Sequence, residues 1–297
     1  MKNTCRICFF ESNENVFSLE EVRQNTKETF DYFKCTNCGS VQIATIPSEM
    51  DKYYENYYSL ERVAAEKKLR SIIRREVFKY RLSNQSLFGK FVSILNPNMF
   101  AWIRPKTFHF NSNILDIGCG NGSLLHKMAE SGFTSLTGVD PFIQKSLKYK
   151  INNVDISIYK DKFENLSEKY DVIMLHHVIE HMDDQQDFFF KIKKLMHSKS
   201  KLIFVLPIIS DRLWDIYGAK GFQFEDIPRH FYIHSKKSFE IILSNHGFKI
   251  ISSVSFFEKK VLNDIHGNCS IKNKNNFKNV LLKEQDTGLI SYYVELV

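Results

Sequence analysis

The stretch NILDIGCGNGSLL, residues 113–125, constrains the fold more than any other part of this 297-residue sequence. Its first half is an apolar run typical of a buried strand, and a helix is expected from Ser123 onward. Between the two, Gly118, Gly120 and Gly122 permit a tight turn and let the backbone approach a ligand closely. Their G-x-G-x-G spacing is neither the G-x-G-x-x-G of dinucleotide-binding proteins nor a P-loop. The stretch therefore predicts a strand, a ligand-binding glycine turn and a helix.

Strands and helices alternate after this turn. Further strands are expected at 135–139, 154–159, 171–177 and 201–206, with a helix near 184–196. Another strand is expected at 248–257, and a last strand at 289–297 should pair antiparallel with it. Such alternation predicts an α/β fold with a parallel sheet that carries helices on both faces.

An acidic residue stands at the tip of the second expected strand. Asp140 follows Asp116 by 24 residues, a placement that suits a bidentate contact with two ribose hydroxyls. Asp161 and Phe163 come after the third strand, where they could meet an adenine ring. Ligands of open α/β sheets bind beyond the carboxyl ends of the strands, so these side chains are expected at one edge.

The N-terminal region carries two Cys-x-x-Cys pairs, Cys5 with Cys8 and Cys35 with Cys38. Four thiolates in two such tight turns are typical of a structural zinc site, which is closed to substrate. A segment this small buries little apolar surface, so Zn²⁺ would supply much of its folding free energy. We predict a zinc ribbon over residues 1–46.

The rest of the chain suggests a second, larger domain. We assign 47–105 to a linker with a basic amphipathic helix at 60–82, and 106–297 to the main domain. The formal charge of +7 permits an anionic partner, and the basic helix could contact phosphates or be a solvated face. No signal peptide and no membrane span are expected, and we expect a cytoplasmic protein.

The motifs ILDIGCGNG, TGVDP and YDVIMLHHVIEH together resemble those of class I S-adenosylmethionine-dependent methyltransferases. The flanking stretches YFKCTNCGSVQ and IPRHFYIHS resemble a branch of small-molecule methyltransferases with an N-terminal zinc ribbon, many of them acting in surface-sugar pathways. The resemblance implies a Rossmann-like, seven-stranded class I methyltransferase sheet with helices on both faces, plus the ribbon. Its implied cofactors are S-adenosyl-L-methionine and structural Zn²⁺.

The resemblance also implies roles for individual residues. The three glycines would pass beneath the amino acid part of the cofactor, and Asp116 would bind its ammonium group. Asp140 would hold the ribose, and Asp161 the adenine amine. The full set of expected cofactor-binding residues is Asp116, Gly118, Cys119, Gly120, Asn121, Gly122, Asp140, Pro141, Asp161, Phe163 and His176.

Candidates for the chemistry follow the fourth strand. His177, Glu180 and His181 would share one face of a helical turn. In one interpretation His181 is a general base oriented by Glu180, and in another the three residues bind a divalent ion. A third interpretation is a purely structural turn. Arg229 and His230, in the insertion after the fifth strand, are candidates for acceptor binding and a second base.

Three functions are compatible with these patterns. The first is methyl transfer to a small-molecule acceptor, foremost a nucleotide-linked or surface-polysaccharide sugar. The second is RNA methylation, in which the ribbon and the basic helix contact the backbone. The third is a non-catalytic module that binds the cofactor or a partner.

Overall fold

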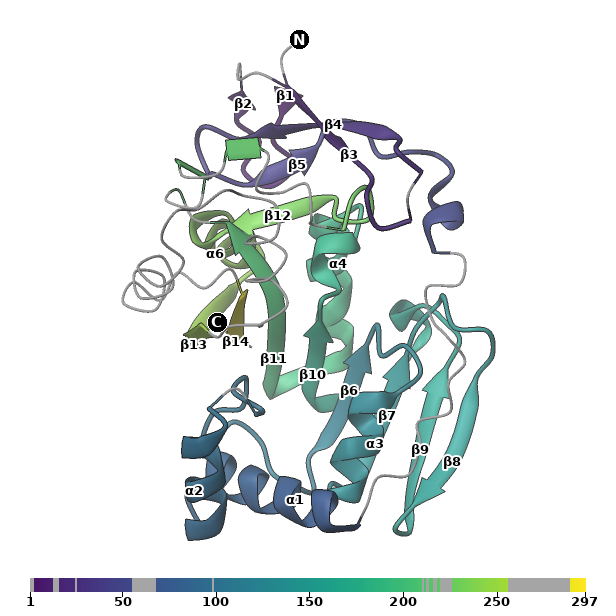
Figure 1. Cartoon of the computed structure of the whole chain (residues 1–297), viewed down its shortest axis with the longest axis vertical. Helices are drawn as coiled ribbons and strands as arrows, with labels where there is room; N and C mark the ends of the chain where they lie inside the picture. The colour runs from purple at the N-terminus through teal and green to yellow at the C-terminus, as the bar shows by residue number, and fades with distance from the viewer. Residues whose placement is uncertain are drawn as a thin grey trace.

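The computed structural model describes residues 3–12, 16–24, 26–54, 68–97, 99–209, 226–255 and 289–297, together with 211, 214, 215, 218 and 219. Seven strands of its central sheet follow one another in the order β9-β7-β6-β10-β11-β14-β13 (Figure 1). The strands are β6 (Asn113–Ile117), β7 (Ser135–Val139), β9 (Val154–Tyr159), β10 (Tyr170–His176), β11 (Met196–Ile209), β13 (Phe248–Ser255) and β14 (Leu289–Leu296).

The first five of these strands are parallel, and β14 runs antiparallel to both β11 and β13. The prediction of a mixed α/β sheet whose last strand is antiparallel is therefore confirmed. The boundaries of β11 differ from the expected 201–206, because the strand continues at both ends of its apolar run.

The strand at the β9 edge of the sheet is not among the expected strands. β8 (Leu147–Ile151) pairs antiparallel with β9 at the edge, where an alternating βα pattern would place a helix. The sequence LKYKI explains the difference: Leu147, Tyr149 and Ile151 are half-buried on one side while the two lysines between them are exposed. This period of two is that of a strand with one solvated face.

Helices cover both faces of the sheet. Along β10, Ile173 and Leu175 belong to one apolar core and Val172 and Met174 to the other, because successive strand residues point to opposite faces. α4 (Gln185–Ile192) and α6 (Lys236–Asn245) contribute to the first core, and α1 (Lys68–Ser83) and α3 (Ser123–Glu130) to the second. A shorter helix, α2 (Leu87–Leu95), packs on α1.

The N-terminal strands form a small β-module at the opposite end of the molecule from α1 and α2 (Figure 1). It contains β1 (Asn3–Thr4), β2 (Glu11–Ser12), β3 (Phe17–Glu20), β4 (Thr29–Lys34) and β5 (Val41–Ile43). β5 pairs with β12 (Tyr232–Ser235), and β12 in turn pairs with the last residues of β11. The module is thus hydrogen-bonded into the main sheet rather than connected only through a linker.

Short 3₁₀ helices complete the described elements: η1 (Met50–Tyr53), η2 (Phe163–Asn165), η3 (Ile179–His181) and η4 (Lys193–Leu195). The basic helix expected at 60–82 is present from Lys68, and its first part, like Tyr57 and Tyr58, lies outside the described residues. Within the described ranges, no helix is both long enough and apolar enough to cross a bilayer.

Candidate active site

The glycine turn joins β6 to α3 and lies against the tip of β7. Gly118, Gly120 and Gly122 have φ angles of 69°, 53° and 76°, in the left-handed region that glycine adopts without strain. Gly118 also has no room for a side chain, because a Cβ there would lie 2.5 Å from Cγ2 of Val178. The turn therefore requires its glycines, as the sequence predicts.

Asp140 follows β7 directly and is fully buried beside this turn. Its Oδ2 accepts a 2.9 Å hydrogen bond from the Gly120 amide, and its Oδ1 accepts a 2.8 Å bond from the Phe142 amide. Two backbone donors thus fix the orientation of the carboxylate. Burial raises the pKa of Asp116, near the end of β6, to about 8, and the negative charge of Asp140 is the second cause of this increase.

A cavity of about 280 Å³ opens at the carboxyl ends of the parallel strands. This is the edge at which open α/β sheets bind ligands. Six carboxylates line it, against one lysine, which makes the cavity suited to a cationic ligand. The acidic residues are Asp140, Asp161, Glu164, Asp183, Asp184 and Asp187, and the lysine is Lys162.

Seven of the residues predicted from the sequence line this cavity: Gly118, Asp140, Pro141, Asp161, Phe163, His177 and His181. The other predicted cofactor-binding residues, Asp116, Cys119, Gly120, Asn121, Gly122 and His176, lie outside its lining. His176 instead makes an edge contact with Trp102, with ring centroids 4.8 Å apart, and burial lowers its pKa to about 3. Its predicted role in cofactor binding stays a prediction.

An aromatic pair covers one side of the cavity. Tyr54, immediately after η1, stacks on Phe142 with centroids 4.3 Å apart and planes inclined by 3°. Tyr54 belongs to the aromatic stretch after the N-terminal module, whereas Phe142 has no sequence signal beyond its place after Asp140-Pro141. The N-terminal region therefore contributes directly to the wall of the cavity.

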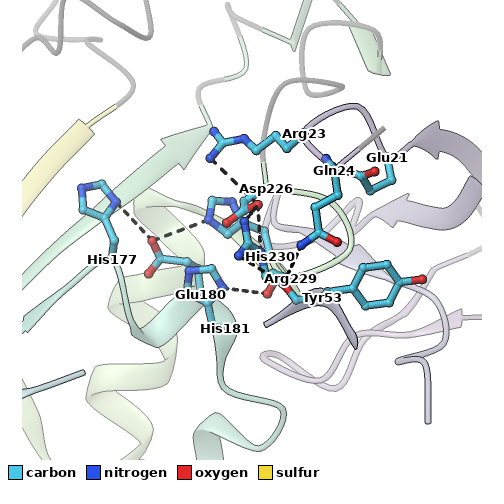
Figure 2. A network of polar contacts seen from close by, with 10 residues as sticks. All are labelled: Glu21, Arg23, Gln24, Tyr53, His177, Glu180, His181, Asp226, Arg229 and His230. Carbon is cyan, nitrogen blue, oxygen red and sulfur yellow. Dashed lines mark hydrogen bonds and ion pairs between the residues drawn. The ribbon is translucent and has the colours of Figure 1, made fainter. Parts of the chain in front are cut away.

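A group of histidines surrounds the buried carboxylate of Glu180 (Figure 2). The Nδ1 atom of His177 lies 3.4 Å from Oε1 of Glu180, and the Nε2 atom of His230 lies 4.0 Å from the same oxygen. His181 and His230 contact each other, with ring centroids 4.7 Å apart. Neither oxygen of Glu180 accepts a hydrogen bond from a described residue. The predicted cluster after β10 thus includes His230, which comes from the distant insertion.

The ionisation of the group follows from its burial. Burial raises the pKa of Glu180, but the close contact with His177 and the charges of the nearby histidines outweigh this effect and lower the pKa to about 2. Burial, and secondarily the charge of His230, lowers the pKa of His181 to about 4. At neutral pH we therefore expect an ionised Glu180 and a neutral His181.

The tautomer of His181 is fixed by the insertion loop. Its Nδ1 atom lies 2.9 Å from the carbonyl oxygen of Arg229, which can only accept, so Nδ1 carries the proton. Nε2 is then the unprotonated nitrogen of the neutral ring. Glu180, His181 and His230 also offer ligand atoms within 4.8 Å of one another, and they are the described residues that could hold a metal here.

Arg229 is buried and its guanidinium is engaged within the protein (Figure 2). Its Nε atom donates a 3.0 Å hydrogen bond to Asp226, and its Nη1 atom donates a 3.3 Å bond to the carbonyl of Tyr53. Gln24 donates to the same carbonyl at 2.7 Å. Arg229 thus connects the insertion to the segment that carries Tyr54, and its predicted role in acceptor binding stays a prediction.

The four N-terminal cysteines meet at one point. The Sγ atoms of Cys5 and Cys38 lie 3.6 Å apart, as do those of Cys8 and Cys35, and all four are within 4.8 Å of one another. The two turns have the same hydrogen bonds, from Phe9 N to the Cys5 carbonyl and from Gly39 N to the Cys35 carbonyl. Two equivalent turns therefore direct four thiols to a common centre.

Residues 60–253 match the model of a family described as a methyltransferase domain. Because the match spans more than half of the chain, the chain belongs to this methyltransferase family. The class of enzyme predicted from the glycine turn and the acid after the second strand is confirmed.

Among curated proteins, the chain is 28% identical over 155 residues to a ubiquinone biosynthesis O-methyltransferase of Rickettsia canadensis, covering 47% of this chain and 65% of that protein. It is 33% identical over 151 residues to the protein of the same name from Bartonella tribocorum, covering 44% of this chain and 60% of that protein. The chain thus spans less than two thirds of these relatives.

Solved structures that the chain matches include the cyclopropane synthase MmaA2 of Mycobacterium tuberculosis, with 16% identity, a TM-score of 0.45 and coverage of 62% of this chain and 78% of that chain. Another is coclaurine N-methyltransferase bound to N-methylheliamine and S-adenosylhomocysteine, with 12% identity, a TM-score of 0.41 and coverage of 84% and 87%.

Several cavity residues have no counterpart among the predicted site residues: Phe142, Met182, Asp183, Asp184, Asp187 and Phe188. The sequence signal for the acids was the run MDDQQD just after His181. Asp184 caps α4 by accepting a 2.9 Å hydrogen bond from the Asp187 amide, which explains its residue type without reference to a ligand.

Proposed function

We propose that this protein transfers a methyl group from S-adenosyl-L-methionine to a small-molecule acceptor. The observation that carries the proposal is Asp140, whose carboxylate is held by two backbone amides beside a glycine turn in a cavity lined by acids. A carboxylate fixed in this way can accept hydrogen bonds from two vicinal hydroxyls, as a ribose requires.

The described residues fit the cofactor. S-adenosylmethionine supplies a methyl group that is already activated by a sulfonium charge. The acidic lining favours that cation, and Gly118 leaves the backbone bare where the cofactor would cross it. Asp116 would hold the ammonium group, because a nearby cation would favour the ionised form of this buried carboxyl. Asp161 and Phe163 would face the adenine.

We propose His181 as the general base that removes a proton from the acceptor. It lines the cavity, and the contact with the Arg229 carbonyl leaves Nε2 free to accept a proton. Glu180 stabilises the imidazolium that forms, because its charge raises the pKa of His181 against the effect of burial. His177 and His230 hold Glu180 in place from two sides.

The alternative for this cluster is a divalent metal bound by Glu180, His181 and His230. Dialysis against EDTA, followed by metal analysis and an activity assay, separates the two interpretations. If turnover is unchanged once all metal except that of the cysteine site has been removed, the result supports His181 as a general base. Loss of turnover that Mg²⁺ or Zn²⁺ restores supports the metal.

We propose a hydroxyl-bearing acceptor, foremost a nucleotide-linked or surface-polysaccharide sugar. Family membership supports a methyltransferase, and the O-methyltransferase names of the two curated relatives favour oxygen as the methylated atom. The test uses the full chain and a tritiated methyl donor with three acceptor panels: nucleotide sugars, catechols and structured RNA. Transfer to the sugars is expected, transfer to catechols alone would replace the sugar proposal, and transfer to RNA alone would contradict a small-molecule acceptor.

For the N-terminal module, over residues 1–46, we propose a structural Zn²⁺ site formed by Cys5, Cys8, Cys35 and Cys38. A tetrahedral ZnS₄ centre with bonds of about 2.3 Å places its sulfurs about 3.8 Å apart, close to the two Sγ distances of 3.6 Å. Gln42 donates a 2.9 Å hydrogen bond to the Cys5 sulfur, as expected around a thiolate ligand. Reduced thiolates also fit the cytoplasmic location that we propose.

A further inference from the structure

The short helix α2 is built with its small residues inside and its large apolar residues outside. Ser86, Gly89 and Ser93 are buried against the protein. A Cβ at Gly89 would lie 2.0 Å from the carbonyl oxygen of Glu76, so α1 and α2 cross in close backbone contact. The usual arrangement of a surface helix, with its apolar stripe toward the core, is reversed.

The outward side of α2 forms one continuous apolar surface, which we call the α2 face. Its five residues lie at spacings of one, four, seven and eight from the first, and each is between 51% and 87% exposed. Lys90 is an exposed polar residue within the same helix. The residues of the α2 face are Leu87, Phe88, Phe91, Ile94 and Leu95. A contiguous exposed surface of this kind marks an interaction site.

The charge of the protein is concentrated on the same part of the chain. Residues 68–112 contain nine Lys and Arg and one acidic residue, so their formal charge is 9 − 1 = +8. The whole chain has 41 − 34 = +7, which leaves 32 − 33 = −1 for all other residues. Arg70, Arg75, Lys90 and Lys106 of this segment are exposed. The excess positive charge of the protein therefore accompanies the α2 face.

We propose that the α2 face docks this protein onto the surface of an anionic lipid bilayer. The apolar side chains would enter the boundary below the headgroups while the surrounding cations contact lipid phosphates. Lys90 can extend its ammonium group from the apolar surface to the headgroups. α1 and α2 lie at the opposite end of the molecule from β1–β5, so docking leaves the N-terminal module clear of the membrane (Figure 1).

The two competing occupants fit less well. A second copy would bring two segments of +8 charge face to face, which electrostatic repulsion opposes. RNA would satisfy the cations but offers no apolar environment for five aliphatic and phenyl side chains. The proposal stands on the charge of residues 68–112 and the exposure of the α2 face, and it does not depend on the proposed methyl transfer.

The test is sedimentation of the full chain with vesicles of phosphatidylcholine alone or with roughly 30% phosphatidylglycerol, at about 0.1 M and about 0.5 M salt. We expect binding to the anionic vesicles at low salt. The paired substitution Phe91→Ser with Ile94→Ser should weaken it by at least about tenfold, ~1.4 kcal/mol. The charge variant Lys90→Glu with Lys106→Glu should also weaken it. Phe190→Ser, at a phenyl ring on α4 that is 66% exposed, is the matched control and should bind like the wild type.

Circular dichroism and a cooperative thermal unfolding transition first establish that each variant is folded. Equal binding of the wild type and the Phe91→Ser, Ile94→Ser variant to anionic vesicles would overturn the proposal. Two other results would also overturn the proposal if the wild type does not bind vesicles. One is a dimer of the protein that the Phe91→Ser, Ile94→Ser variant no longer forms. The other is RNA binding that the same substitutions weaken.

Discussion

Acidification from pH 7 to pH 5 is expected to destabilise the protein through His234, a buried residue of β12. Its Nδ1 atom lies 3.1 Å from the hydroxyl of Ser238, while Nε2 has no hydrogen-bond partner among the described residues. The rings of Tyr232 and Phe239 lie beside it. Protonation of Nε2 would place a charge in this apolar surrounding, so burial lowers the pKa of His234 to about 4, against a smaller opposing effect of the Glu180 charge.

The sign and size of the effect follow from proton linkage. A histidine in the unfolded chain titrates near 6.5, so between pH 6.5 and pH 4 the unfolded state binds more protons, and the free energy of unfolding falls as the pH falls. With a folded pKa of about 4, His234 alone lowers this free energy by about 2 kcal/mol between pH 7 and pH 5. His176 and His181, whose pKa values are also lowered by burial, act in the same direction.

The substitution His234→Phe isolates this contribution. It removes the titrating ring and costs the bond to Ser238, about 1 kcal/mol, at both pH values. Urea unfolding of wild type and variant at pH 7 and pH 5 should therefore show a pH-dependent loss that is smaller in the variant by about 2 kcal/mol. The control is His109→Phe at an exposed ring, which should lose stability in parallel with the wild type. Equal losses in His234→Phe and the wild type would refute the reasoning.

Three further predictions concern the site and the cysteines. Gly118→Ala should destabilise the fold by about 1–3 kcal/mol in urea unfolding, because the φ of 69° and the 2.5 Å approach to Val178 both oppose a Cβ. Adding Val178→Ala should recover part of this stability, and an unchanged free energy of unfolding in Gly118→Ala would contradict the close approach. His181→Gln should reduce turnover about a hundredfold or more with unchanged affinity for S-adenosylhomocysteine. In the pH–rate profile of the wild type, the acid limb should lie near pH 4, because the base must be neutral, and an acid limb at about pH 6.5 would count against the lowered pKa of His181. Cys35→Ser should lose its bound zinc, measured by elemental analysis, and should have a Tm lower by on the order of 10 °C. The control Cys119→Ser should retain the metal, and an unchanged zinc content in Cys35→Ser would exclude the four-cysteine site.

Local patterns were sufficient to predict the core of the fold. The glycine turn, the strand before it and Asp140 are neighbours in sequence, and each has a geometric requirement that few residue types meet. The antiparallel last strand was predictable because a polar stretch, expected to be a loop rather than a crossover helix, precedes its apolar run. The helix that an alternating βα pattern would place at β8 is absent from the described residues, because the LKYKI pattern has the period of two of a strand.

Contacts across the chain were not predictable in this way. His230 meets Glu180 because β5 of the N-terminal module pairs with β12, and the amide of Phe231 donates a 2.9 Å hydrogen bond to the Glu180 carbonyl. The stacking of Tyr54 on Phe142 depends on the same long-range packing. Both pairs join residues that lie more than forty positions apart, and the spacing of single residues does not encode such pairings.

The central claim is that the cavity beside the glycine turn binds S-adenosylmethionine through Asp140. The direct measurement is isothermal titration of the full, zinc-loaded chain with S-adenosylhomocysteine, for the wild type and for Asp140→Asn. We predict saturable binding by the wild type and an affinity at least about tenfold lower in the variant, because charge-assisted hydrogen bonds contribute about 1.5–3 kcal/mol. Absence of binding by the folded wild type, or equal affinity in Asp140→Asn, would contradict the account.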